Sequence, residues 1–371
     1  MIHRIHLVVG ARPNFMKAAP LFRELRRRPW CRPVLVHTGQ HYDYALSQAF
    51  FEDLGMPAPD HSLDVGSASH AVQTAAVMSG YDAVLGCDRP SMVVVVGDVN
   101  STLACALTAV KEGVPVAHLE AGLRSRDRTM PEEINRLVTD AVADRLWTPS
   151  PDADDNLLGE GVPRERIARV GNIMMDCFEM LRPSIEAGNG PAALGLAPGG
   201  FAVATLHRPS NVDTPQALAA VVEALSRLSE RLPVVFPVHP RTRERLSRFG
   251  LARVLEDLPG LRCVEPMGYV DFMGLVTRAA LVVTDSGGLQ EETTYLGLPC
   301  LTVRDNTERP VTVTQGTNRL CRPGDIDALA GEILAGGAPK GRRPELWDGR
   351  AAGRVADDID RFLHGPQGAR P

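Results

Sequence analysis

A short polar turn with two glycines separates an apolar run from a helix-forming run in the second half of the chain. The turn is Thr284-Asp285-Ser286-Gly287-Gly288, and residues 289–292 continue it with a helical pattern. The first N–H groups of a helix lack partners within the helix and carry a partial positive charge, so they bind phosphate. Because glycine has no Cβ, an anion can closely approach the backbone at Gly287 and Gly288. The sequence therefore predicts a phosphate-binding strand, turn and helix start.

Two carboxylates follow apolar runs in the first half. Asp98 ends a run that begins at Met92, and Glu120 ends a run that begins at Val114. One helical pattern connects these runs, so we expect neighbouring parallel strands, which lie about 4.8 Å apart and would bring the carboxylates close together. Neighbouring carboxylates push their pKa values apart, which suits acid–base chemistry. A helix-capping Asp98 and an ion-paired Glu120 would explain the same pattern without catalysis.

Basic and imidazole side chains also occur at helix starts and strand ends. Arg12 and Lys17 open the first helical pattern, where they could meet an anion or a carboxylate. His207 and His239 each follow a strand of the second half, facing an expected cleft between two domains. No third residue has the spacing of a metal ligand, so hydrogen bonding or proton transfer is the favoured interpretation and no metal is predicted.

Pro131 starts one helical pattern, whose apolar stripe is Ile134, Leu137, Val138, Ala141 and Val142. Glu132 and Arg136 are four residues apart and lie off this stripe, so an ion pair along the helix explains them structurally. The preceding segment, Gly122 to Arg128, is interpreted as a long, mobile charged loop.

Length and composition limit the class of protein. The 371 residues suggest two domains, with 44% hydrophobic and 23% charged residues. A net charge of −5 and only 5% aromatic residues argue against nucleic acid as a partner. Seven scattered cysteines predict neither a disulfide framework nor a zinc site. No run approaches the roughly 18 apolar residues of a membrane span, and the apolar run at the start is short for a signal peptide, so a cytoplasmic enzyme is expected.

The order of elements predicts an α/β fold with two Rossmann-like domains. Continuous apolar runs typical of buried parallel strands alternate with helical patterns in both halves. The Gly-Pro-rich segments at 187–191 and 197–200 are interpreted as the linker. We expect an N-terminal domain of residues 1–171 plus about 350–371, and a C-terminal domain of residues 172–349. The predicted strands are 5–9, 34–37, 92–96, 114–119, 201–206, 234–238, 280–284 and 300–303, and the clearest helices are 13–27, 44–54, 102–112, 214–231, 289–296 and 349–363.

Taken together, these segments resemble the non-hydrolysing UDP-N-acetylglucosamine 2-epimerases. The resemblance extends from residue 4 to about residue 320, and the matching blocks occur in the order of the family. Its pieces are Gly10-Ala11-Arg12-Pro13, Lys17, Thr38-Gly39-Gln40-His41, Gly97-Asp98, His118-Leu119-Glu120-Ala121-Gly122-Leu123-Arg124, Pro131-Glu132-Glu133-Ile134-Asn135-Arg136, Val170-Gly171-Asn172, His207-Arg208, Pro237-Val238-His239, Thr284 to Glu292, Arg304-Asp305 and Thr307-Glu308-Arg309-Pro310.

The resemblance implies a glycosyltransferase-B architecture, with two Rossmann-like domains facing a cleft, and a homodimer. It implies a UDP-sugar substrate and neither cofactor nor metal, with no nucleic-acid or membrane partner. The positions that match the family's catalytic set are Asp98, Glu120, Glu132 and His207. The positions implied in binding UDP or the substrate are Arg12, Lys17, Arg136, His239, Phe272, Ser286, Gly287, Gly288, Glu292 and Arg309.

The implied reaction inverts C2 of UDP-N-acetylglucosamine and gives UDP-N-acetylmannosamine. UDP is eliminated across C1–C2 to give 2-acetamidoglucal, and it then re-adds while C2 receives a proton on the opposite face. Alternatives are a 2-epimerase for a variant UDP-N-acetylhexosamine, a retaining glycosyltransferase that uses a UDP-sugar, a hydrolysing epimerase, and a UDP-sugar sensor without activity. The sequence marks no acceptor site, and it retains all four positions of the catalytic set, which disfavours the sensor.

Two stretches depart from the family pattern. The usual His-Arg-Arg-Glu-Asn is here His207-Arg208-Pro209-Ser210-Asn211, so an acidic residue is lost and a variant UDP-sugar is a possible substrate. Many bacterial members also have a different sequence around Gln40 and His41, positions that the family uses in a second, activating site for UDP-N-acetylglucosamine.

The second departure predicts weak or absent activation by substrate. We expect hyperbolic rather than sigmoidal initial-rate curves at low UDP-N-acetylglucosamine. Strong stimulation by a trace of this nucleotide sugar would contradict the prediction.

Overall fold

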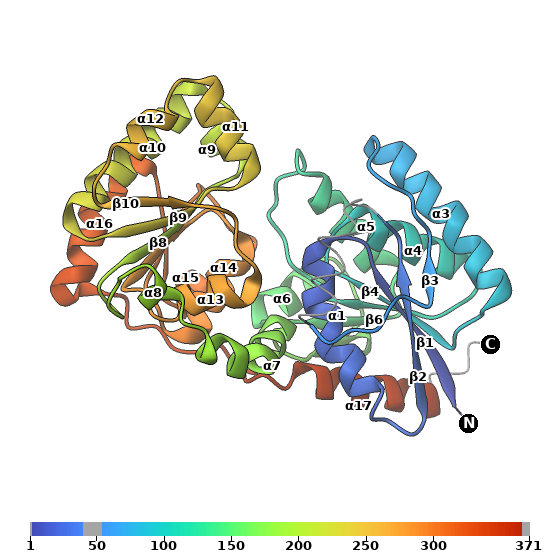
Figure 1. The fold of residues 1–371 in the computed structure, drawn as a ribbon. Helices are drawn as coiled ribbons and strands as arrows, with labels where there is room; N and C mark the ends of the chain where they lie inside the picture. Colours follow the sequence, from blue (N-terminus) through green and yellow to red (C-terminus); the bar gives the residue numbers. More distant parts are fainter. Residues whose placement is uncertain (1, 40–53, 366–371) are drawn as a thin grey trace. The chain divides into compact units, whose positions relative to one another are not determined.

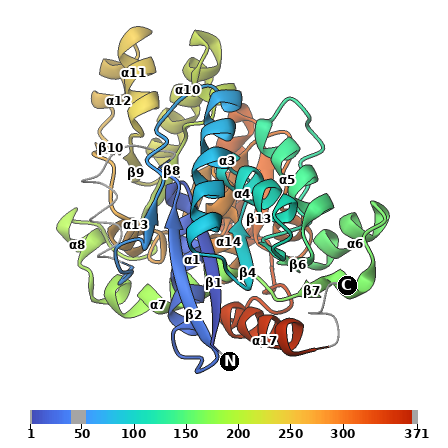
Figure 2. The same ribbon diagram turned by 90° about the vertical axis from the view of Figure 1, so that its right-hand side faces the viewer.

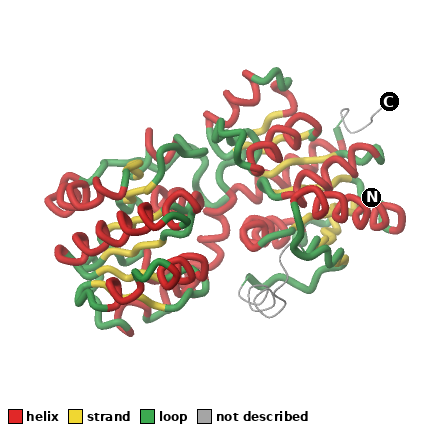
Figure 3. Tube along the Cα trace, turned by 90° about the horizontal axis from the view of Figure 1, so that it is seen from above, coloured by secondary structure: helices red, strands yellow, loops and turns green. Residues whose placement is uncertain are grey.

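The computed structural model describes residues 2–39 and 54–365, and its contacts divide the chain into two compact units (Figure 1). Unit 1 comprises Met1–Met180 and Glu345–Pro371, and unit 2 comprises Leu181–Pro344. Each unit is an α/β fold in which helices cover a sheet of parallel strands (Figure 3). The prediction of two α/β domains built on parallel sheets is thus confirmed.

The sheet of unit 1 has seven strands in the order β3-β2-β1-β4-β5-β6-β7, all parallel. The elements of this unit are β1 His3–Val9, α1 Arg12–Leu25, β2 Cys31–His37, β3 His61–Ser62, α3 His70–Cys87, β4 Met92–Val96, α4 Asn100–Lys111, β5 Val116–Leu119, α5 Pro131–Val142, β6 Arg145–Thr148, α6 Pro151–Gly159, η1 Arg164–Arg166, β7 Ile167–Arg169, most of α7 Ile173–Ala187, and α17 Ala351–His364.

The sheet of unit 2 has six parallel strands in the order β10-β9-β8-β11-β12-β13. The elements after α7 are α8 Gly190–Ala193, β8 Ala202–Thr205, α9 Pro209–Val212, α10 Pro215–Arg231, β9 Val234–Pro237, α11 Pro240–Arg248, α12 Ala252–Glu256, β10 Leu261–Val264, α13 Tyr269–Val276, β11 Leu281–Thr284, α14 Gly287–Leu296, β12 Cys300–Val303, α15 Val311–Thr314, β13 Asn318–Cys321, η2 Pro323–Asp325, α16 Ile326–Glu332 and η3 Ile333–Gly337.

The central strands are apolar along their whole length because helices cover both faces of the sheet. Every residue of β4 is buried, and its Val93 and Val95 pack with α3 and α4 residues such as Tyr81 and Ala104. In unit 2, α10 and α16 supply much of the core that covers β8, β9 and β11. None of the helices within residues 2–39 and 54–365 has the length and apolar character needed to cross a membrane.

The segment interpreted as the linker does not separate the units. Residues 187–200 lie inside unit 2, and the first crossing between units falls within α7, after Met180. A helix can connect two units without a glycine-rich break, which is why composition alone misplaced the boundary. Of the helix predicted at 44–54, residues 44–53 lie outside the described residues.

The C-terminal helix α17 belongs to unit 1 and packs beside α1 (Figures 1 and 2). Its Asp358 is buried, and it accepts hydrogen bonds from Trp147 Nε1 at 2.7 Å and from Arg145 at 2.7–3.0 Å. This buried carboxylate is satisfied by strand β6, so it fixes the last helix to the sheet.

Candidate active site

The predicted site residues gather where the strand order of each sheet reverses. In unit 1, β1 and β4 are neighbours, and the strand that follows each of them in sequence lies on its outer side, so the two connections run in opposite directions. In unit 2 the same is true of β8 and β11. Open parallel sheets bind ligands at such points, beyond the carboxyl ends of the strands. Arg12 and Asp98 follow β1 and β4, while His207 and Ser286 follow β8 and β11.

One cluster of unit 1 joins Lys17 of α1 to Glu120 at the end of β5. Both side chains are largely buried and form an ion pair. A Cβ on Gly97 would lie 3.3 Å from Lys17 Nζ and 3.4 Å from Glu120 Oε2, so glycine lets the turn after β4 approach this pair. Glu120 has a φ of 74°, a left-handed conformation that costs a non-glycine residue about 1 kcal/mol. Backbone strain of this kind is common at functional sites.

A second cluster joins Asp98 to α5. Arg136 Nε donates to Asp98 Oδ2 at 3.0 Å, and Arg136 also pairs with the buried Glu133. The predicted ion pair between Glu132 and Arg136 is therefore wrong, because Arg136 turns toward the site. Glu132 is half-buried and has no hydrogen bond or ion pair within the described residues.

Helix α5 buries its polar side rather than its apolar stripe. Its buried residues are Glu133, Asn135, Arg136, Thr139 and Asp140, whereas Ile134 and Leu137 are only half-buried. The polar side chains hold the loop after β5, since Ser125 N and Arg126 N donate to Glu133 at 2.9 Å and Gly122 N donates to Asp140 at 3.0 Å. The interpretation of residues 122–128 as a mobile loop is therefore wrong for its first part, residues 122–125, which are buried.

The predicted strand, turn and helix start of unit 2 is confirmed, with β11 ending at Thr284 and α14 starting at Gly287. Ser286 occupies the N-cap position, and its side chain makes no capping hydrogen bond within the described part of the chain. A Cβ on Gly288 would meet open space, so the helix start is accessible there. The guanidinium of Arg309 lies beside Gly287, 2.8 Å from where its Cβ would be, and pairs with Glu308 and Glu291.

The buried carboxylate of Asp285 organises the turn after β8. It accepts His207 N at 2.9 Å, Arg208 N at 2.8 Å and Asn211 Nδ2 at 3.0 Å. The Nδ1 atom of His207 lies 3.2 Å from Asp285 Oδ1, an arrangement that orients the imidazole. The ring of His239 lies beside that of His207, with centroids 5.1 Å apart, and burial followed by the influence of His207 lowers the pKa of His239.

His207 and His239 are not part of a potential metal-binding cluster within the described residues. The described residues contain no group of three or more His, Cys, Asp or Glu side chains that could hold a metal ion.

Glu292 and Phe272 lie on neighbouring helices of unit 2. Glu292 is 6% exposed and accepts a hydrogen bond from Tyr269 Oη at 2.5 Å. Burial raises the pKa of Glu292 to about 7; the hydrogen bond from Tyr269 opposes this shift and the charge of Glu291 adds to it. Phe272 is half-buried on α13, three residues after Tyr269.

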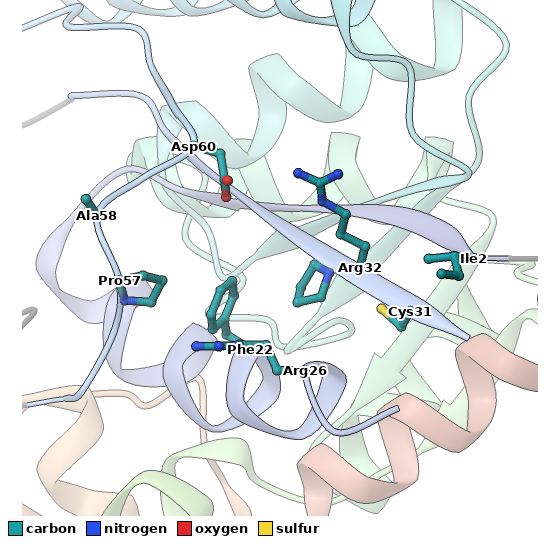
Figure 4. Close-up of a pocket in the computed structure, with 9 residues that line it drawn as sticks. Ile2, Phe22, Arg26, Cys31, Arg32, Pro57, Ala58 and Asp60 are labelled. Carbon is teal, nitrogen blue, oxygen red and sulfur yellow. The ribbon is translucent and has the colours of Figure 1, made fainter. Parts of the chain in front are cut away.

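The structure does not describe the side chains of three predicted site residues. Gln40 and His41 lie outside the described residues, and the side chain of Arg12 is not described. A shallow hollow of about 440 Å³ in unit 1, lined by Arg26, Arg32 and Asp60 among others, lies where β2 begins (Figure 4). It contains none of the predicted site residues.

The sequence analysis did not identify the residues that hold the predicted site residues in place by hydrogen bonds. Asp285 is one of them, and its place between a predicted strand and a pair of glycines is the signal that could identify it from the sequence. Tyr269 and Asp140 gave no signal, because their partners, Glu292 and His118, are distant in sequence.

The chain is similar to known proteins over most of its length. The family model described as UDP-N-acetylglucosamine 2-epimerase matches residues 23–360. A UDP-N-acetylglucosamine 2-epimerase of Methanococcus maripaludis is 39% identical over 325 residues, which cover 86% of this chain and 88% of that protein. A UDP-2,3-diacetamido-2,3-dideoxy-D-glucuronate 2-epimerase of Pseudomonas aeruginosa is 43% identical over 321 residues, covering 85% and 88%.

A solved structure gives a similar result. The UDP-GlcNAc 2-epimerase of Methanocaldococcus jannaschii, in complex with UDP-GlcNAc and UDP, superposes with a TM-score of 0.87 at 36% identity and covers 96% of this chain and 99% of that one. The fold of this chain is therefore that of two Rossmann-like domains in the glycosyltransferase-B class.

The buried Glu292 predicts a pH-dependent stability. Its folded pKa of about 7 lies above the ordinary value of 4.5, so its stabilising contribution is complete below pH 4.5 and is lost as the pH rises through 7. Glu292→Gln removes this titration while keeping an oxygen for Tyr269. Relative to wild type, the variant should gain on the order of 3 kcal/mol in unfolding free energy between pH 4.5 and pH 8.

Urea unfolding of both proteins at pH 4.5, 6, 7 and 8 measures this difference. Glu230→Gln, at an exposed position of α10, is the matched control and should show no such trend. A pH-independent difference for Glu292→Gln would contradict the prediction.

Proposed function

Because the chain belongs to the UDP-N-acetylglucosamine 2-epimerase family, we propose that it interconverts UDP-N-acetylglucosamine and UDP-N-acetylmannosamine. The observation that carries the proposal is the match of residues 23–360 to this family. The uncapped start of α14, with Arg309 beside it, and the carboxylates that follow β4 and β5 support it.

The proposed reaction is redox-neutral. A base removes the C2 proton while the C1–O bond to UDP breaks, which leaves 2-acetamidoglucal. UDP then attacks C1 again, and an acid delivers a proton to the other face of C2. The reaction therefore needs one proton acceptor, one proton donor and a site that stabilises departing UDP, and it consumes no oxidant or metal. Asp98, Glu120, Glu132 and His207 are proposed to carry the proton transfers.

Unit 2 is proposed to hold the nucleotide. Ser286, Gly287 and Gly288 would hold the diphosphate at the start of α14, where preorganised donors stabilise the leaving group. Glu292 would bind the ribose hydroxyls and Phe272 would lie against the uracil. Arg12 and Arg309 are also proposed to bind the diphosphate, and Lys17, Arg136 and His239 are proposed to bind UDP or the sugar.

Two identities of the sugar in the UDP-sugar substrate are compatible with the family. The Pseudomonas aeruginosa relative is named for a diacetamido-glucuronate, so a variant UDP-N-acetylhexosamine is the second candidate. A retaining glycosyltransferase shares the fold class, but it would require an acceptor molecule.

Proton exchange tests the proposal directly. The protein is incubated with UDP-N-acetylglucosamine in D₂O, and the sugar is followed by proton NMR and mass spectrometry. Deuterium at C2 together with a new UDP-N-acetylmannosamine signal is expected. An unlabelled substrate would reject this assignment; a parallel incubation with the diacetamido-glucuronate nucleotide then tests the variant, and product formed only with an added acceptor would indicate the glycosyltransferase.

Removing the charge of Asp98 or Glu120 should abolish turnover while sparing nucleotide binding. Asp98→Asn and Glu120→Gln are expected to lower kcat by about 10²- to 10⁴-fold, the range contributed by a positioned acid or base. UDP affinity measured by calorimetry should change little, because the proposed UDP contacts lie mainly in unit 2. Lost UDP affinity with unchanged turnover would contradict the assigned roles.

The family resemblance also leads us to propose a homodimer. Helices α3, α4 and α5 are neighbours in unit 1 and carry apolar side chains that are exposed or half-buried. These include Val72 and Ala76 of α3, Leu107 of α4, and Ile134 and Leu137 of α5. A second copy of the chain would bury this surface.

Light scattering in solution should therefore give twice the mass of the chain. Ala76→Arg, at an exposed position of α3, should shift the protein toward monomer. Val254→Arg, at an exposed apolar position of unit 2, is the matched control and should not. A wild-type monomer at micromolar concentration would refute the proposal.

A further inference from the structure

The turn that carries Asp98 is held by side chains along its whole length. The Val96 carbonyl accepts Asn14 Nδ2 at 2.9 Å and Thr102 Oγ1 at 2.7 Å. The next carbonyl, of Gly97, lies 2.8 Å from His118 Nε2, and the Asp98 carbonyl accepts Asn135 Nδ2 at 2.9 Å. Three consecutive carbonyls thus depend on side-chain donors from α1, α4, β5 and α5.

His118 bridges this turn to α5 from within the sheet. It lies on β5, two residues before Glu120, and is completely buried. Its Nε2 contacts Gly97 O, and its Nδ1 lies 2.6 Å from Asp140 Oδ1. A backbone carbonyl can only accept a hydrogen bond, and an ionised carboxylate also only accepts. Each ring nitrogen therefore faces an oxygen that accepts, and one side chain links the Gly97 carbonyl to a carboxylate of α5.

Two further donors hold Asp140. It accepts Gly122 N at 3.0 Å and Arg124 Nη1 at 2.7 Å, and Arg124 pairs with Glu160 at 2.6 Å. Burial alone would raise the pKa of Asp140, but His118 and Arg124 outweigh it and lower that pKa below its ordinary value, so the carboxylate is ionised.

We propose that His118 is a positioning residue: a buried side chain that ties the Gly97–Asp98 turn to α5 and so places the Asp98 carboxylate for proton transfer. The inference rests on the proposed function, because it assumes that Asp98 reacts with substrate. His118 itself does not touch the substrate. It acts through Gly97 O on one side and through Asp140 on the other, while Arg136 of the same helix fixes the carboxylate of Asp98.

Kinetics of His118→Gln test this role. Glutamine cannot donate to both Gly97 O and Asp140 in the geometry of the ring, so the turn loses an anchor. We expect kcat to fall about 10²-fold, the cost of a misplacement of about 1 Å, with KM and the Kd for UDP within about twofold of wild type. His6→Gln is the matched control: His6 is equally buried on β1 of the same sheet and bonds Tyr81 Oη at 3.1 Å, but it does not contact the turn.

A double variant separates positioning from general damage. If His118 acts through Asp98, then His118→Gln should slow the Asp98→Asn enzyme by much less than it slows wild type, since effects of coupled residues are not additive. Equal fold-losses in both backgrounds, or a loss no greater than that of His6→Gln, would overturn the proposal.

Amide hydrogen exchange tests the positioning role without turnover. Exchange in the peptide spanning residues 92–102 should be faster in His118→Gln than in His6→Gln, because the turn has lost an anchor. Equal exchange in the two variants would overturn the inference. If wild type fails to turn over any UDP-sugar while the exchange result is as expected, the anchor stands and the proposed function fails.

Discussion

Buried carboxylates must find hydrogen-bond donors inside the protein, and this requirement shapes the loops on which the proposed site depends. In unit 2, Asp285 is fully buried and collects two backbone N–H groups and the Asn211 amide, which folds the turn after β8 around it. In unit 1, Glu133 and Asp140 do the same for the loop after β5. The carboxyl ends of both sheets therefore have defined shapes before any ligand arrives.

The same requirement explains why α5 is inverted. An amphipathic helix ordinarily buries its apolar stripe, because that burial is the main source of its stability. Here the polar stripe faces inward, where Asn135, Arg136 and Asp140 supply the bonds that the turn after β4 and the loop after β5 need. The apolar stripe is left half-exposed, and the proposed second copy of the chain would cover it. On this argument the proposed dimer and the proposed active site are two consequences of one helix orientation.

The sequence predicted what depends on local patterns. Continuous valine-rich runs such as Met92–Val96 could be recognised as buried strands, and the glycine pair after Thr284 predicted the start of α14. Contacts between segments that are far apart in the sequence could not be predicted from these local patterns. Periodicity indicated the helix that starts at Pro131 but suggested an ion pair of Arg136 with Glu132, whereas the structure pairs Arg136 with Asp98, 38 residues away in sequence. The interpretation of residues 187–200 as the linker is wrong for a related reason, since the chain passes from unit 1 to unit 2 within the continuous helix α7.

The departure from the family pattern at Pro209-Ser210 has a structural reading that bears on substrate choice. Both residues are exposed, whereas Asn211, which follows them, is buried and bonds Asp285 and the Val303 carbonyl. The hydrogen bonds that hold the turn come from Asn211 and from the backbone of His207 and Arg208, and none of them involves the side chains of residues 209 and 210. Loss of the family's acidic residue therefore leaves the orientation of His207 intact. The loss of the acidic side chain changes only the contacts that residues 209 and 210 can make. A different sugar is therefore compatible with unchanged 2-epimerisation chemistry.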